Sequence, residues 1–276
     1  MKDCIDQLIA AGIEESEAKK EISILESEIK DKEKIKKIID ERIKKRIPIQ
    51  YLIGKAYFMD FEVKVNNEVL IPRPETEILV EEATRRCKSR LAPTALDIGT
   101  GSGIIAIALA KLIPDIKITA VDINKEIVDL ASENAKLNSV DEKINFKVCD
   151  VFSDCFEGLI QSQKFDLIIS NPPYVKPDEL QKLKPEIMHE PEIALYGSKE
   201  NKTGLIYYER IVELMCRCGS RPTPTIMAFE IDPPLVEDLK SLLKKNNLTN
   251  FEIVKDYAKL DRCLFVYLNP QLLHNF

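Results

Sequence analysis

The chain has 276 residues, 45% apolar and 31% charged, which suits one large α/β domain or a compact domain with a smaller one attached. No apolar run approaches the roughly 18 residues needed to cross a bilayer, and residues 1–10 lack a signal-peptide core, so we expect a cytoplasmic protein with no membrane partner. The net charge of −6 disfavours direct binding of nucleic acid, because neutralising phosphates requires a cationic surface.

Residues 1–47 predict a small helical domain, since apolar residues recur at helical spacing in three stretches. Gly12 suits the end of the first helix, and Pro48 stops the third. The Lys- and Glu-rich faces are explained most simply as solvated surface, and docking to a partner is the alternative. The apolar positions are Ile5, Leu8 and Ile9, then Ala18, Ile22, Leu25 and Ile29, then Ile35, Ile38, Ile39, Ile43 and Ile47.

Residues 48–74 predict a linker and a β-hairpin between two domains. Apolar and polar residues alternate from residue 57 to residue 71 around Asn66-Asn67, and Asn tolerates the positive φ that a tight turn needs. We therefore expect the hairpin to turn at this pair. Pro72-Arg73-Pro74 then breaks the chain before a helical period resumes.

Residues 75–276 alternate short apolar strands with helical stretches, which favours an open parallel sheet covered on both faces. Only a short loop separates the last two strands, so they should pair antiparallel. Seven strands with a reversed final pair are typical of the Rossmann-like sheet of class I S-adenosylmethionine (SAM)-dependent methyltransferases. The predicted strands are 95–98, 116–123, 144–149, 165–170, 225–231, 251–254 and 263–268.

The cysteines form no CxxC pair and no Cys/His ligand set, so we expect no metal site. An odd, scattered set predicts reduced thiols that pack as small apolar groups. The seven positions are Cys4, Cys87, Cys149, Cys155, Cys216, Cys218 and Cys263.

A glycine-rich loop follows the first strand of the larger domain, and it holds three of the nine glycines of the chain. Its Gly-x-Gly-x-Gly spacing lacks the third glycine of a dinucleotide fingerprint, and it has no Walker lysine. Positive φ at glycine lets a ligand lie against the backbone, and an adenosyl group with a compact amino-acid tail fits better than a pyrophosphate. We therefore predict SAM contacts at Gly99, Thr100, Gly101, Ser102 and Gly103.

Carboxylates end the next two strands. Asp122 can accept both hydrogens of a ribose diol; the alternative is a helix cap, which the neighbouring Asn124 could supply instead. Asp150 and Val151 follow the third strand, where they would flank an adenine ring. The alternative for Asp150 is to cap the turn at Phe152.

The fourth strand runs into Asn171-Pro172-Pro173-Tyr174. The prolines stiffen this turn and remove two N–H donors. The Asn171 side-chain oxygen and the Pro172 carbonyl could hold both hydrogens of a conjugated NH2 group, whose nitrogen is otherwise a poor nucleophile. We predict Asn171, Pro172 and Tyr174 as catalytic residues, with Pro173 completing a substrate-binding turn on which Tyr174 stacks. The alternative is an ordinary strand-ending turn.

Together these residues resemble the release factor glutamine methyltransferase family over essentially the whole chain. The resemblance implies methyl transfer from SAM, with S-adenosylhomocysteine as product, to the glutamine side-chain amide in the Gly-Gly-Gln motif of class I peptide release factors. It also implies that Asn171 contacts SAM and that the helical domain and hairpin grip the release factor. The strings that carry it are QYLIG (50–54), LIPRPETE (70–77), GTGSG (99–103), NPPY (171–174) and Glu190-Pro191 followed by Ala194-Leu195.

Some positions depart from the family pattern. Val151 stands where an aromatic residue is common, the loop after Leu195 differs, and Glu230-Ile231-Asp232 replaces the usual Glu-Ile-Gly. Three other functions are weighed against the resemblance. They are a DNA adenine-N6 methyltransferase, which would flip its base, a non-enzymatic module that keeps the fold, and a nicotinamide dehydrogenase.

Overall fold

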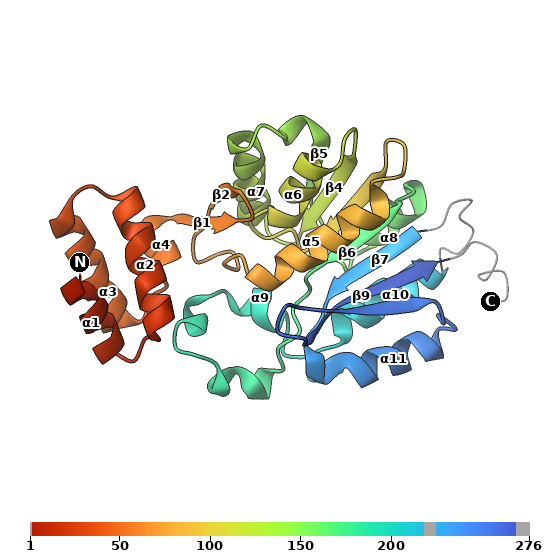
Figure 1. Ribbon diagram of the computed structural model, residues 1–276. Helices are drawn as coiled ribbons and strands as arrows, with labels where there is room; N and C mark the ends of the chain where they lie inside the picture. The colour runs from red at the N-terminus through yellow and green to blue at the C-terminus, as the bar shows by residue number, and fades with distance from the viewer. Residues whose placement is uncertain (1, 218–224, 269–276) are drawn as a thin grey trace.

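The computed structural model describes residues 2–217 and 225–268. A helical segment lies beside a larger α/β part, and a short β-hairpin lies between them (Figure 1). None of the helices within these residues is both long and apolar enough to span a bilayer.

The helical segment contains the three helices that the apolar spacing predicts: α1 (Lys2–Ala10), α2 (Glu15–Glu28) and α3 (Lys32–Lys45). Gly12 adopts a φ of 82° just after α1, and the Asp31 carboxylate accepts a hydrogen bond from the Glu33 N–H at the start of α3. The segment has a core of its own, formed by Cys4, Leu8, Ile13, Ala18, Ile22, Leu25, Ile35 and Ile39.

Two charged residues of this segment, Arg42 and Glu21, are buried, contrary to the interpretation of its charged faces as solvated surface. The Arg42 side chain is fully buried, and its Nη2 donates to Glu21 Oε1 at 3.0 Å. Its Nη1 donates to Glu186 Oε1 at 2.9 Å, across 144 residues of sequence. Arg46 also pairs with Glu186, at 2.5 Å. These ion pairs attach the helices to the loop that follows the central strand β6 (Leu167–Ser170).

Replacing Arg42 with Ala is expected to lower the free energy of unfolding by roughly 3–5 kcal/mol, because it leaves Glu21 buried without its cation. Burial already raises the pKa of Glu21, against the hydrogen bond from Arg42. Urea-induced unfolding measures the change. Lys36→Ala on the same helix is the control, because its pair with Glu33 is exposed and should contribute about 0–1 kcal/mol. Equal losses in the two variants would contradict a structural role for the buried network.

The hairpin forms, but its turn lies elsewhere than predicted. After α4 (Ile49–Ile53), β1 (Lys55–Phe58) pairs antiparallel with β2 (Phe61–Lys64). The turn falls at Met59, which has a φ of 50° and whose N–H donates to Glu77 Oε1 at 2.8 Å. The prediction that the hairpin turns at Asn66-Asn67 is wrong: these residues lie beyond β2 and form a separate turn, in which the Val69 N–H donates to the Asn66 carbonyl at 3.2 Å. Glu77 lies in α5 (Pro74–Cys87), so the turn of the hairpin is attached to this helix.

The larger part is built on a seven-stranded sheet with the order β5-β4-β3-β6-β7-β9-β8, which confirms the predicted α/β class. The strands β5, β4, β3, β6 and β7 are parallel, and β9 pairs antiparallel with both β7 and β8, as expected for the final pair. The strands are β3 (Thr94–Ile98), β4 (Lys117–Asp122), β5 (Ile144–Val148), β6 (Leu167–Ser170), β7 (Thr225–Glu230), β8 (Phe251–Lys255) and β9 (Asp261–Leu268).

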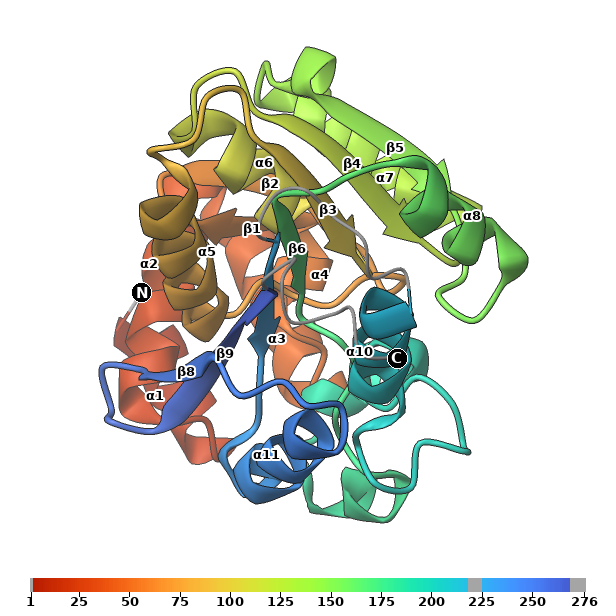
Figure 2. The same cartoon turned by 90° about the vertical axis from the view of Figure 1, so that its right-hand side faces the viewer.

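Helices cover both faces of this sheet (Figures 1 and 2). One face shares its buried apolar residues with α5 (Pro74–Cys87), α6 (Ile104–Leu112) and α7 (Lys125–Leu137). The other packs against α8 (Asp154–Ser162), α10 (Ile206–Arg217) and α11 (Val236–Lys245). The remaining short helices are η1 (Asp141–Lys143), η2 (Pro177–Lys182), η3 (Ile187–His189), α9 (Glu192–Leu195) and η4 (Pro233–Leu235).

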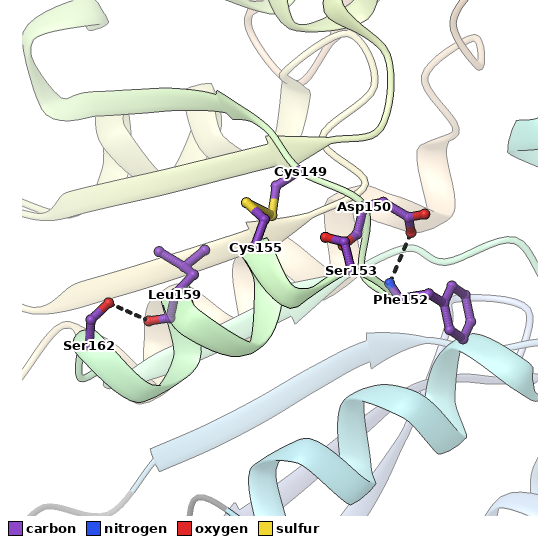
Figure 3. The surroundings of a disulfide bond; sticks show 7 residues. All are labelled: Cys149, Asp150, Phe152, Ser153, Cys155, Leu159 and Ser162. Atoms are coloured by element: carbon purple, nitrogen blue, oxygen red, sulfur yellow. Dashed lines mark hydrogen bonds between the residues drawn. A yellow bond between two sulfur atoms is a disulfide. The ribbon is translucent and has the colours of Figure 1, made fainter.

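Two of the seven cysteines form a disulfide, contrary to the expectation that all of them are free thiols. Cys149, just after β5, forms a disulfide with Cys155 in the first turn of α8, with 6.1 Å between the Cα atoms (Figure 3). The tight turn between β5 and α8 brings the two side chains together, which a search for CxxC spacing does not detect. Cys218 lies outside the described residues, and buried free thiols are found at Cys4, Cys87, Cys216 and Cys263.

Candidate active site

The predicted site residues follow the carboxyl ends of neighbouring strands. Because β3 pairs with both β4 and β6, the loops after these three strands meet at one edge of the sheet. A cavity opens there, in the place where open α/β sheets bind small molecules. The predicted residues that line it are Gly99, Thr100, Gly101, Ser102, Asp122, Asp150, Val151, Asn171, Pro172 and Pro173.

The glycine loop lies on the cavity with three residues in the left-handed region: Gly99, Gly101 and Gly103 have φ values of 70°, 53° and 87°. The N–H groups of Gly99 and Thr100 donate to the Val121 carbonyl at 2.9 and 3.0 Å, which fixes the loop to β4. Gly103 does not line the cavity. A Cβ there would lie 3.2 Å from the Ala131 Cβ, so this glycine permits α6 to pack closely on α7.

Asp122 presents its carboxylate to the cavity and also supports the glycine loop. Its Oδ2 accepts from the Gly101 N–H at 3.0 Å, and its Oδ1 from the Ile123 N–H at 2.8 Å. Desolvation raises the pKa of this carboxyl. Asn124 caps α7 by accepting from the Glu126 N–H at 3.0 Å, so the carboxylate of Asp122 is not used as a cap.

Asp97 lies within the predicted strand 95–98, and the sequence did not indicate a role for it in the site. It is fully buried, and its Oδ2 accepts from the Thr100 Oγ1 hydroxyl at 2.7 Å. Its Oδ1 has no hydrogen-bond partner in the described structure, and burial raises its pKa to about 7. The signal in the sequence is an acidic residue in an apolar strand, two positions before the glycine loop. Asp97 does not line the cavity, and its hydrogen bond with Thr100 ties the end of β3 to the glycine loop.

Asp150 lines the cavity and caps a turn at the same time. Its Oδ1 accepts from the Phe152 N–H at 2.9 Å, and its carbonyl accepts from the Ser153 hydroxyl at 2.6 Å (Figure 3). Val151 beside it is buried, and its carbonyl accepts from Arg210 Nε at 3.1 Å. The turn therefore holds both residues in fixed positions on the cavity wall.

The turn after β6 is anchored from several sides. The Ser170 hydroxyl donates to the Ile98 carbonyl at 2.7 Å, which ties the end of β6 to β3. The Pro173 carbonyl accepts from Asn201 Nδ2 at 3.2 Å, and Gly204 passes so close that a Cβ on it would lie 2.5 Å from the Tyr174 carbonyl. Tyr174 does not line the cavity. Its ring packs against the apolar cluster that α10 and α11 share with the sheet, so the predicted stacking face is not presented to the cavity.

Asn171 is held by residues that the sequence interpretation did not connect with it. Its Nδ2 donates to the Thr76 hydroxyl oxygen at 3.4 Å, and this hydroxyl donates to Glu230 Oε2 at 2.6 Å. Thr76 and Glu230 are each 1% exposed. The Asn171 side-chain oxygen is therefore the amide atom directed away from Thr76.

Two of the sequence strings that carry the family resemblance, LIPRPETE (70–77) and Glu190-Pro191, contact each other in the structure. Arg73 Nη2 pairs with Glu190 Oε1 at 2.5 Å, and the Ile71 N–H donates to Glu190 Oε2 at 3.2 Å. His189, in contrast, contacts the Lys45 carbonyl at an exposed position and does not line the cavity.

The sheet order, the glycine loop after β3 and the carboxylate that ends β4 define the chain as a class I SAM-dependent methyltransferase. A family model described as "Methyltransferase small domain" matches residues 74–195. The N-terminal domain of human METTL16 in complex with S-adenosylhomocysteine has a similar fold. Its TM-score is 0.53 at 14% identity, over 83% of this chain and 78% of that one.

The chain belongs to the release factor glutamine methyltransferase family. It is 38% identical over 245 residues to the "Release factor glutamine methyltransferase" of Thermodesulfovibrio yellowstonii, covering 86% of this chain and 82% of that protein. It is 39% identical over 236 residues to the protein of the same name from Fusobacterium nucleatum, covering 85% of this chain and 64% of the relative's length.

Proposed function

We propose that this chain methylates the side-chain amide nitrogen of the glutamine in the Gly-Gly-Gln motif of class I peptide release factors. The observation that supports this most is the position of the Asn171 turn on the same cavity as the glycine loop and Asp122. When bound, SAM supplies a methyl group on a positively charged sulfur and leaves as neutral S-adenosylhomocysteine, while the amide nitrogen gives up one of its two hydrogens as a proton to solvent. The names of the relatives agree with this substrate.

The turn provides what an unreactive amide nitrogen needs. The Asn171 side-chain oxygen and the Pro172 carbonyl each accept one hydrogen of the glutamine NH2 group, which raises the electron density on nitrogen and fixes its direction. Proline at positions 172 and 173 places no N–H donor where it would compete for these acceptors. Tyr174 supports the turn from the apolar core.

The cofactor is assigned to the other side of the cavity. Backbone groups from Gly99 to Ser102 face the amino-acid tail, Asp122 accepts from the ribose hydroxyls, and Asp150 and Val151 flank the adenine. Gly103 shapes the loop from behind. The three left-handed glycines are consistent with a ligand placed close to this backbone.

Binding of the substrate protein is assigned to the N-terminal part of the chain. The helical domain (1–47) and the linker with its hairpin (48–74) grip the release factor, and the methyltransferase domain (75–276) carries the reaction. The Arg42–Glu186 pair fixes the helical domain next to the loop that follows the catalytic turn. Release factors act on cytoplasmic ribosomes, so the reaction takes place in that compartment without membrane or nucleic acid.

Incubation with SAM and a purified class I release factor, followed by peptide mass analysis of the Gly-Gly-Gln segment, tests the proposal. One added methyl group on the glutamine is expected. Parallel incubation with isotope-labelled SAM and duplex DNA provides the comparison. Label in DNA alone, with an unmodified release factor, would overturn the substrate assignment in favour of an adenine methyltransferase.

A further inference from the structure

A chain of three buried or half-buried polar side chains leads from the interior to the Asn171 turn. Glu230 ends β7, Thr76 lies in the first turn of α5, and Asn171 follows β6. Thr76 and Glu230 are 154 residues apart in sequence, yet 2.6 Å separates their oxygens. The proposed function uses Asn171 alone, which leaves the other two without an assigned task.

The number of available hydrogens fixes the direction of the two hydrogen bonds between these side chains. The Thr76 hydroxyl has a single hydrogen, and the short contact with the ionised Glu230 carboxylate takes it. The Thr76 oxygen can then only accept a hydrogen bond from Asn171, at 3.4 Å. The Asn171 group that faces Thr76 must therefore be the NH2. The side-chain oxygen, which is the acceptor needed by the substrate amide, points the other way.

We propose that Thr76 and Glu230 are positioning residues that orient the Asn171 amide for methyl transfer, an inference that rests on the proposed function. We call the two hydrogen bonds that join Glu230, Thr76 and Asn171 the relay. Without the relay, the Asn171 amide could rotate by half a turn and present its NH2 to the substrate NH2. Two donors would then face each other, and the nitrogen would lose one of its two acceptors. Thr76 lines the cavity, but within the described residues its side chain hydrogen-bonds Asn171 and Glu230 and not the glycine loop. We therefore expect the effect on the transfer step rather than on SAM binding.

The surroundings of Glu230 make its charge state sensitive to pH. Burial raises the pKa of this carboxyl to about 7, against the opposing hydrogen bond from Thr76. Below that pH the protonated carboxyl can itself donate to Thr76, which releases the threonine hydrogen and removes the direction of the relay. The titratable and charged groups around Glu230 are Arg73, Glu75, Tyr174, Tyr208, Arg262 and Cys263.

Substitution of Thr76 tests the relay through kcat. Thr76→Val keeps the shape but removes the hydroxyl, and kcat is expected to fall about 10- to 100-fold because a buried donor and a buried acceptor lose their partner. The dissociation constant for SAM, measured by calorimetry, should stay within about threefold. Thr76→Ser restores the hydroxyl and should recover most of kcat. Thr84→Val is the matched control on the same helix, because the Thr84 hydroxyl has no hydrogen-bond partner within the described residues.

The pH profile of kcat at saturating SAM separates positioning from a structural role. The wild type should lose activity as the pH falls through about 7, the pKa of Glu230. Asp97 also titrates near 7, so the assignment depends on Glu230→Gln. A glutamine oxygen still accepts from Thr76 but does not ionise, so this limb of the profile should disappear in the variant.

Two failures remain distinguishable. An unmethylated release factor with the wild-type enzyme overturns the proposed function, and the relay with it. A wild-type enzyme that methylates, together with Thr76→Val at wild-type kcat, overturns the relay alone. The relay is equally overturned if Thr76→Val loses SAM affinity or folding stability with unchanged kcat, or if Thr76→Ser fails to restore turnover.

Discussion

Replacing Asn171 with Ala is expected to lower kcat for glutamine methylation by roughly 10²–10³-fold or more, the scale seen when one preorganised polar contact to a reacting group is removed. The variant takes away the only side-chain acceptor in the turn and leaves the Pro172 carbonyl to hold the substrate nitrogen alone. Affinity for SAM should stay within about threefold, because the glycine loop and Asp122 remain in place.

Single-turnover transfer to a release factor and calorimetric titration with SAM measure the two quantities separately. Asn246→Ala is the matched control: this asparagine is also partly buried, but its Nδ2 donates to the Leu242 carbonyl at the end of α11, away from the cavity. Wild-type turnover by Asn171→Ala would rule out the proposed role of the turn. A loss confined to SAM binding would make Asn171 a cofactor contact only.

Replacing Asp122 with Ala should have the opposite signature, with SAM affinity falling about 100-fold. Two hydrogen bonds to a charged acceptor together contribute about 3 kcal/mol on common estimates. The carboxylate also holds the Gly101 N–H at 3.0 Å, so the variant loosens the glycine loop as well. With SAM at saturating concentration, kcat should recover to within about tenfold of the wild type.

Titration with SAM or S-adenosylhomocysteine measures this loss. Asp129→Ala provides the control, because that carboxylate pairs with Lys125 on the exposed surface of α7. Retained affinity in Asp122→Ala would remove the ribose assignment. A deficit in kcat that persists at saturating SAM would instead place Asp122 in the transfer step.

Elements with a strong local signal are those that the sequence predicts well. The inner strands of the sheet are mainly apolar, and the edge strands β5 and β8 include polar residues between apolar ones. The reversed final pair follows from a connection too short for a crossover. The same strand ends place the glycine loop, Asp122 and Asn171 on one edge, since neighbouring parallel strands share their carboxyl ends.

Most of the errors come from contact between residues far apart in sequence; the disulfide between Cys149 and Cys155, which are six positions apart, is the exception. The hairpin turns at Met59 rather than at Asn66-Asn67, and the Met59 N–H there is bound by Glu77, 18 residues further along the chain. Arg42 looks like one more charge on a polar helix, and only Glu186, 144 residues away, explains its burial. The bond between Thr76 and Glu230 has no local pattern at all.

A crystal structure with S-adenosylhomocysteine and a Gly-Gly-Gln peptide bound together tests the central claim most directly. The account predicts the glutamine amide nitrogen within roughly 2.7–3.2 Å of both the Asn171 side-chain oxygen and the Pro172 carbonyl, facing the cofactor sulfur. A glutamine nitrogen bound elsewhere, or an Asn171 amide turned with its NH2 toward the substrate, would contradict it.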